Sequence, residues 1–220
     1  MDVYNWIVGN KELVKIFYAL IIVFICTVIV IKTDRLFRIS LHNGIRYFRN
    51  AFFFFGVGFM SRYFLKGFPD YYVNKIIFEF FMIMAGCFLL YSLLWKRIES
   101  FEMDYSSSLF NPYILVFYLM SFIIVFADYL WLNYYGMFGS QIVLFGFASI
   151  ISYINYQKNK SRPFLKFYFI AMILSFTAWL LNAGASSLLN WNQGILIAIY
   201  FLNIIIFLVF LFGVMRVTAR

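Results

Sequence analysis

Residues 44–65 read GIRYFRNAFFFFGVGFMSRYFL, and this stretch decides the fold. Between its charged ends, residues 50–61 carry no charge and include a run of four phenylalanines. A stretch of this length predicts a membrane-spanning helix whose cationic ends reach the two lipid–water interfaces. Gly56 and Gly58 have the spacing typical of small residues that let helices pack closely in lipid. The charges at the two ends are Arg46, Arg49 and Arg62.

Six further apolar runs of similar length surround this stretch. A spanning helix needs about 20 apolar residues. The runs reach that length without the strict alternation that lipid-facing β-strands show. The sequence therefore predicts an all-α, polytopic integral membrane protein, a seven-helix transmembrane bundle forming a single domain over residues 1–220. The predicted spans are residues 13–32, 45–65, 73–95, 112–132, 136–156, 163–185 and 194–215.

Composition supports a multi-pass protein of the cell membrane. Hydrophobic residues make up 65% of the chain, against roughly 45–50% in soluble globular domains. The formal net charge of +9 is better explained by contact with anionic lipid headgroups than by nucleic acid, because no soluble domain is present to hold nucleic acid. Cys26 and Cys87 both lie inside apolar runs, which favours packing over disulfide or metal binding.

Lysine and arginine fall unevenly on the two sides of the predicted bundle, and the positive-inside rule uses this asymmetry to orient a membrane protein. The poorer side carries Lys11, Lys15, Arg62, Lys66 and Lys75. The richer side carries Lys32, Arg35, Arg38, Arg46, Arg49, Lys96, Arg97, Lys158, Lys160, Arg162, Lys166, Arg216 and Arg220. We therefore expect the amino terminus outside the cell and the carboxyl terminus in the cytoplasm.

A basic face is expected on the cytoplasmic side. Residues 33–45 (TDRLFRISLHNGI) are too short and too charged to span, so we expect them to lie along the membrane surface. The face would contact anionic lipid or a signalling partner. Its predicted members are Arg35, Arg38, Arg46, Arg49, Lys158 and Lys160.

Polar side chains within apolar helices are the best candidates for function, because burying them in hydrocarbon costs about 2.5–3.5 kcal/mol each on insertion scales. In the predicted topology they share the outer half of the bundle. We expect them to line an outward-facing ligand or ion pocket in which Arg62 neutralises an acid. The alternative is a structural ion pair. The candidates are Arg62, Glu79, Asp128, Trp179, Asn182 and Asn203.

Helical spacing predicts which residues face the interior, since positions i, i+3 or i+4, and i+7 share one face of a helix. Small and polar residues recur at that spacing, which suits both helix packing and a water-filled pocket. The predicted inward stripes include Ala51, Phe55, Gly58 and Arg62; Glu79 and Gly86; Ser121 and Asp128; Gln141, Phe145, Ala148 and Ser152; Ser175, Trp179, Asn182 and Ser186; and Tyr200 and Asn203.

Motifs for known chemistry are absent from the sequence. It contains no HExxH, CxxC or GxSxG, and the single histidine, His42, has no second metal-binding residue near it in sequence. The seven-helix layout resembles that of microbial rhodopsins and of small sugar transporters. However, residues 194–215 contain no lysine for a retinal Schiff base, and no proline lies inside a predicted helix to act as a transporter hinge. We expect no enzyme, no metal and no cofactor.

The predicted function is transport or permeation of a small solute or ion through the outward pocket. Two alternatives remain open. One is a heptahelical sensor or receptor that signals through its basic cytoplasmic face. The other is a structural subunit of a larger membrane complex, either a homo-oligomer or an assembly with other chains.

Overall fold

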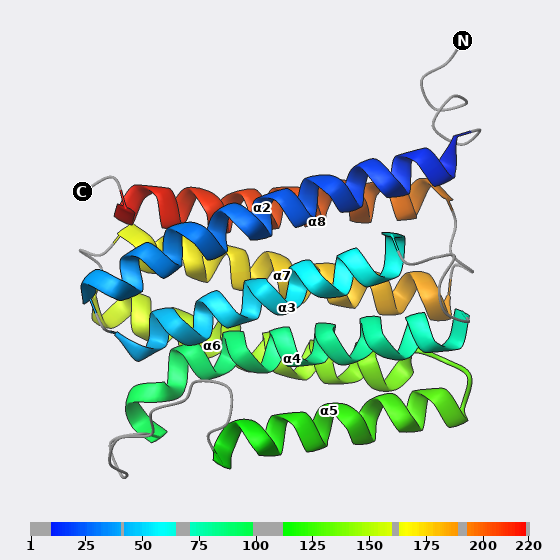
Figure 1. Cartoon of the computed structure of the whole chain (residues 1–220), viewed down its shortest axis with the longest axis horizontal. Helices are drawn as coiled ribbons and strands as arrows, with labels where there is room; N and C mark the ends of the chain where they lie inside the picture. Colours follow the sequence, from blue (N-terminus) through cyan, green and yellow to red (C-terminus); the bar gives the residue numbers. More distant parts are fainter. Residues whose placement is uncertain are drawn as a thin grey trace.

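Seven α-helices account for the regular structure in the described part of the chain (Figure 1). The structure is a computed structural model, and it describes residues 10–40, 42–64, 71–98, 112–159, 163–188 and 193–218. The helices are α2 (Lys11–Ser40), α3 (Asn43–Phe64), α4 (Tyr71–Ile98), α5 (Pro112–Leu130), α6 (Tyr135–Lys158), α7 (Pro163–Ser187) and α8 (Gln193–Thr218).

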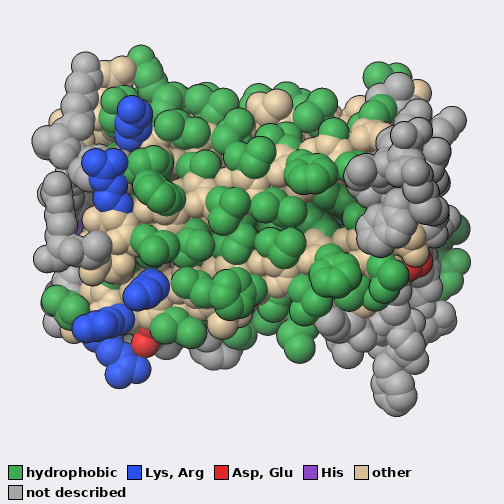
Figure 2. All heavy atoms as spheres, turned by 90° about the horizontal axis from the view of Figure 1, so that it is seen from above, with side chains coloured by type: hydrophobic (Ala, Val, Ile, Leu, Met, Phe, Trp, Pro, Cys, Tyr) green, Lys and Arg blue, Asp and Glu red, His purple; other side chains and the backbone are tan. Residues whose placement is uncertain are grey.

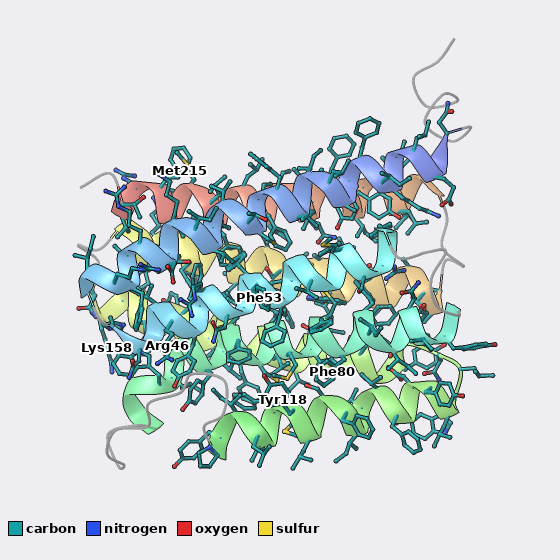
Figure 3. The ribbon with its side chains drawn as sticks, in the orientation of Figure 1. Arg46, Phe53, Phe80, Tyr118, Lys158 and Met215 are labelled. Carbon is teal, nitrogen blue, oxygen red and sulfur yellow. The ribbon has the colours of Figure 1, made fainter. Side chains whose placement is uncertain are left out.

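Six of the helices form a closed ring. Helix α3 packs between α2 and α4, α4 packs on α6, α6 on α7, α7 on α8, and α8 returns to α2. Helix α5 stands outside this ring against α4 and α6, at the edge of the bundle in Figure 1. Phe80 of α4 and Tyr118 of α5 stack there with ring centroids 6.2 Å apart (Figure 3). The ring therefore encloses an interior to which α5 does not contribute directly.

The protein is a helical membrane protein. Six of the described helices (α2, α4, α5, α6, α7 and α8) are long and apolar enough to cross a membrane. On the face shown in Figure 2, hydrophobic side chains cover most of the middle, and the visible Lys and Arg side chains lie at one end. The polytopic all-α prediction is confirmed, whereas seven crossings and their orientation remain predictions.

Helix α3, which corresponds to the predicted span over residues 45–65, is not among those six. Its arginines, asparagines and glycines lower its hydropathy, yet most of its aromatic side chains are buried by the rest of the ring, Phe53 being an exposed exception. Phe52 is fully buried, with its ring centroid 5.0 Å from that of Phe210 on α8. Phe48 contacts Phe164 of α7 and Phe210 of α8. The helix is thus held largely by packing against other helices of the ring.

Two glycines bring α3 close to its neighbours, as their spacing predicts. A Cβ at Gly56 would lie 3.4 Å from the Cβ of Cys26 on α2. A Cβ at Gly58 would lie 3.3 Å from the Cβ of Phe81 on α4. The two residues therefore serve different interfaces, one on each side of α3.

Helix boundaries agree with the predicted spans to within a few residues, except at the end of α2. Residues 33–40, predicted to leave the helix and lie along the membrane surface, instead continue α2, while their depth relative to the membrane remains a prediction. Their polar groups are satisfied inside the helix and by α3. Thr33 donates to the Ile29 carbonyl at 2.6 Å. Asp34 accepts from Arg38 at 3.1 Å and also pairs with Arg49 of α3.

The two ends of the bundle differ in the number of cations that they carry. The basic end is where α2, α4, α6 and α8 finish and α3, α5 and α7 begin. Arg46 and Lys158 lie there in Figure 3. Its described cations are Lys32, Arg35, Arg38, Arg46, Arg49, Lys158, Lys166 and Arg216. The opposite end, here the Arg62 end, carries Lys15, Arg62 and Lys75 among the residues whose side chains are described.

Candidate functional site

A cavity of about 110 Å³ lies inside the helical ring, between the Arg62 end and the middle of the bundle. All six ring helices contribute to its wall, and no residue of α5 does. Toward the basic end the interior is filled by packed aromatic rings, including Phe48, Phe52, Phe210 and Tyr168. The cavity is therefore blocked on that side by the aromatic core.

Four of the predicted pocket residues line this cavity: Arg62, Trp179, Asn182 and Asn203. They come from α3, α7 and α8. Arg62 and Asn203, the first and last of them, are more than a hundred residues apart in the sequence. Tyr18 of α2, which was not among the predicted pocket residues, also lines the cavity. Its hydroxyl accepts a hydrogen bond from Asn203 Nδ2 at 3.0 Å. Its ring stacks on Tyr200 with centroids 4.5 Å apart.

Arg62 occupies an aromatic setting. Its guanidinium carbon lies 4.4 Å from the ring centroid of Phe78 and 5.8 Å from that of Tyr63. Such stacking orients a guanidinium while leaving its edge N–H groups directed away from the ring face. Among the described residues that line the cavity, Arg62 is the only charged one. The cavity consequently has a cationic site at one end.

The rest of the cavity wall is predominantly aromatic and aliphatic. Phenylalanines from α3, α4, α6 and α8 surround it, together with methionine, leucine and isoleucine side chains. A concave apolar site with a few convergent polar groups is the usual form of a small-molecule site. These lining residues are Phe55, Phe59, Phe78, Met82, Leu89, Met137, Phe138, Phe145, Leu196, Ile199, Ile206, Phe207 and Phe210.

Glu79, another predicted pocket residue, lies behind the wall rather than in it. Its side chain is about 1% exposed, and its neighbours on α4, Phe78 and Met82, face the cavity. The structure pairs it with Lys75, whose Nζ is 3.6 Å from Glu79 Oε1. In the described structure neither carboxylate oxygen of Glu79 accepts a hydrogen bond.

Lys75 was not predicted as a site residue, yet its ammonium group is at the centre of this region. Its side chain is 7% exposed. Its Nζ donates to the Asn133 carbonyl at 2.6 Å and the Asp128 carbonyl at 3.4 Å. It also lies 4.4 Å from the ring centroid of Tyr134, which lines the cavity. Lys75 and Glu79 are four residues apart in an apolar helix, so they share one face of it. This spacing is the sequence signal that indicates their pairing.

Asp128, the sixth predicted residue, does not line the cavity and acts at a helix end. Its two carboxylate oxygens accept the backbone N–H groups of Gly136 and Met137, both at 2.7 Å. These amides belong to the first turn of α6, where N–H groups lack partners within the helix. The carboxylate is fully buried, and the positive end of the helix dipole stabilises its charge.

The inward stripes predicted from helical spacing are confirmed most fully on α6. Gln141, Phe145, Ala148 and Ser152 are all buried there. On the other helices the buried members of the stripes are Ala51, Phe55, Gly58, Glu79, Gly86, Ser121, Asp128 and Ser175.

The predicted basic face is partly engaged in contacts within the protein. Asp34 pairs with both Arg38 and Arg49, and the Arg46 guanidinium lies 5.7 Å from the ring centroid of Phe37. Arg35 and Lys158 are exposed. Lys160 lies outside the described residues. Exposed cations therefore remain at this end for contact with headgroups.

Within the described residues, no group of three or more His, Cys, Asp and Glu side chains is placed to hold a metal ion. His42 packs edge-on against Trp95, with centroids 4.7 Å apart. No protein-family model, curated protein or solved structure matches this chain.

Proposed function

We propose that the protein binds a small solute in the cavity inside the helical ring and carries it across the cell membrane. The observation that carries this proposal is the cavity itself. It combines a cationic and polar end (Arg62, Asn182 and Asn203) with an aromatic body, and all six ring helices contribute to it. A site built from every helix of a ring is well placed to change shape when the helices move.

The lining favours a small organic anion with an apolar or aromatic body. A guanidinium provides charge-assisted hydrogen bonds to anionic oxygens. The aromatic wall provides apolar burial for the remainder of the solute. No catalytic step is part of this proposal.

The proposed orientation places the Arg62 end outside and the basic end in the cytoplasm, with α3 as a seventh crossing. Exposed cations such as Arg35 and Lys158 would then meet the anionic inner leaflet. In this orientation the cavity lies in the outer half of the bundle. The aromatic core separates it from the cytoplasm.

Solute binding is tested on the full-length protein in detergent, with thermal unfolding as the readout. Three probes of similar shape differ in head-group charge: benzenesulfonate, neutral benzenesulfonamide and cationic phenyltrimethylammonium. We expect benzenesulfonate to raise the unfolding temperature most. Losing a charge-assisted hydrogen bond costs about 1.5–3 kcal/mol, so R62Q should weaken benzenesulfonate binding roughly tenfold to a hundredfold. R38Q, at the basic end, is the matched control and should bind as the wild type does.

Transport is then measured as benzenesulfonate uptake into liposomes that contain the protein, because this permanent anion does not cross lipid unaided. Uptake above that of protein-free liposomes, reduced by R62Q and retained by R38Q, supports the proposal. Equal thermal shifts with all three probes, or binding that R62Q leaves unchanged, would contradict it.

A sensor is the second candidate, because the aromatic core at Phe48, Phe52 and Phe210 blocks the cavity toward the basic end. A sensor needs a site that binds but does not conduct. Benzenesulfonate binding without uptake, in liposomes of verified orientation, would favour this alternative over transport.

A further inference from the structure

We propose that Glu79 is a proton-binding site and that Lys75 transmits its charge state to the solute cavity. The inference deepens the proposed function and rests on it for the coupling, though not for proton binding. Glu79 is a buried carboxyl group that has no role in solute binding itself.

The surroundings of Glu79 suit a group that alternates between two protonation states. A buried carboxylate normally receives several hydrogen bonds, because losing its hydration is costly. Glu79 receives none among the described residues. Its one ionic partner, Lys75 Nζ, is 3.6 Å away and donates instead to the Asn133 carbonyl at 2.6 Å. Among the described residues the charged state is therefore supported by cations at a distance, Lys75 and Arg62, and by no hydrogen bond.

Charged groups act on Glu79 from α4 itself and from two of the helices packed against it, α3 and α5. Lys75 acts from α4 itself, while Arg62 of α3 and Asp128 of α5 also act on it electrostatically. Asp128 is already stabilised by two backbone N–H groups at the start of α6. On the α6 side, the phenol ring of Tyr134, just before the first residue of α6, lies against Lys75. Glu79 is consequently the acid in this group whose own contacts favour its charge least.

Lys75 connects Glu79 to the cavity. Its ammonium is shared between the Glu79 carboxylate, the carbonyls of Asp128 at the end of α5 and Asn133 in the α5–α6 turn, and the ring of Tyr134. Tyr134 lines the cavity, and so does Phe78, the residue before Glu79, on which Arg62 stacks. When Glu79 is ionised, its carboxylate attracts the Lys75 ammonium. When Glu79 is neutral, the ammonium stays hydrogen-bonded to the Asn133 carbonyl in the α5–α6 turn. The charge state of Glu79 thus alters the position of the cation behind the cavity wall.

The chemical step is a reversible proton transfer with water. Loading forms an O–H bond between a carboxylate oxygen of Glu79 and a proton delivered by hydronium, which becomes water. Release breaks that bond, leaves the electron pair on the oxygen and returns the proton to water. A proton that accompanies a solute anion cancels its charge, so the pair moves without electrical work against the membrane potential.

Proton binding is tested first without solute, by infrared difference spectroscopy of the full-length protein across a pH change. A buried carboxylic acid has a C=O stretch distinct from those of solvent-exposed acids. We expect a band of this kind that titrates in the wild type, disappears in E79Q and persists in E12Q, which alters an exposed acid at the same end. The band should reappear at a shifted frequency in E79D, which keeps the carboxyl group if E79Q folds poorly. A titrating band that is unchanged in E79Q overturns the proposal.

Coupling is tested in liposomes with benzenesulfonate as the probe. An external acid gradient of about one pH unit should raise uptake severalfold, up to the tenfold that a unit of proton gradient allows. E12Q should respond to the gradient as the wild type does. E79Q should no longer respond to the gradient, but it should still exchange internal for external benzenesulfonate. A gradient response that survives in E79Q overturns the coupling. Failure of benzenesulfonate to bind at all would contradict the proposed function, while the infrared result would still decide whether Glu79 binds a proton.

Discussion

The carboxylate of Asp128, near the end of α5, holds the backbone N–H of Gly136, in the first turn of α6, at 2.7 Å. Met137 donates to the other oxygen at the same distance. The two helices are thus joined across their short turn by one side chain that caps the second helix. Lys75 of α4 adds a third element by donating to the Asp128 carbonyl of α5 and to the Asn133 carbonyl of the turn.

Removing this cap should destabilise the protein. Loss of a capping side chain costs about 0.5–2 kcal/mol, and each buried N–H left without an acceptor adds about 1–3 kcal/mol. We therefore expect D128A to lower the apparent free energy of unfolding by roughly 2 kcal/mol or more. The measurement is thermal or denaturant unfolding of the full-length protein in detergent.

Gly136 supplies the internal check on this prediction. A Cβ at Gly136 would lie 2.8 Å from Asp128 Oδ1, whereas a Cβ at Gly139, in the same helix, meets nothing within 4 Å. G136A should destabilise the wild type, and its effect should shrink in the D128A background because the two changes disrupt the same contact. G139A should be near neutral in both. Strictly additive effects of D128A and G136A would refute the capping role.

The helices were predictable from sequence because bilayer thickness sets their length and proline marks their starts. Pro112 and Pro163 are the first residues of α5 and α7, as their positions predict. The end of α2 was not predictable from hydropathy. Asp34 keeps the helix going past the apolar run by pairing with Arg38 one turn later and with Arg49 on α3. The second of these contacts exists only in the tertiary structure.

Candidate site residues could be selected by polarity and depth, but their partners could not. Arg62, Asn182 and Asn203 reach one cavity because α3, α7 and α8 belong to the same ring. The i,i+4 spacing of Lys75 and Glu79 permits their pairing, but nothing in the sequence shows that Lys75 also binds the Asn133 carbonyl or that Asp128 caps a helix. Those roles depend on where the α5–α6 turn lies against α4. Polar residues in membrane helices thus identify the region of a site more reliably than their individual roles.

Gly86 should be required for the packing of α4 on α6. A Cβ there would lie 2.8 Å from Gln141 Oε1 and 3.2 Å from Leu144 Cδ1. Gln141 is fully buried and donates to the Met82 carbonyl at 2.9 Å, so it has little freedom to move. We expect G86A to lower the unfolding free energy by about 1–3 kcal/mol, the usual cost of overpacking.

Gly184 of α7 provides the matched control for this prediction, because a Cβ at that position meets nothing within 4 Å. In a helix, Gly→Ala at an open site stabilises by up to about 1 kcal/mol. G184A should therefore unfold at the same temperature as the wild type or a higher one. If G86A and G184A behave alike, close approach at Gly86 is not what holds α4 and α6 together.

The proposed crossing of the membrane by α3 can be measured with single cysteines on either side of it. Ile39, at the end of α2, is 76% exposed, and Tyr72, at the start of α4, is 46% exposed. The two native cysteines, Cys26 and Cys87, are buried and can be replaced by alanine. In intact cells a membrane-impermeant maleimide should label Y72C, while I39C should react only after permeabilisation.

Two further positions serve as controls, because the basic end faces the cytoplasm in the proposed orientation. Trp131, 71% exposed in the α5–α6 turn, should behave as Y72C does when changed to cysteine, and K158C should behave as I39C does. Labelling of I39C and Y72C from the same side would mean that α3 does not span the bilayer. A reversed pattern at all four positions would keep the seven crossings and invert the orientation.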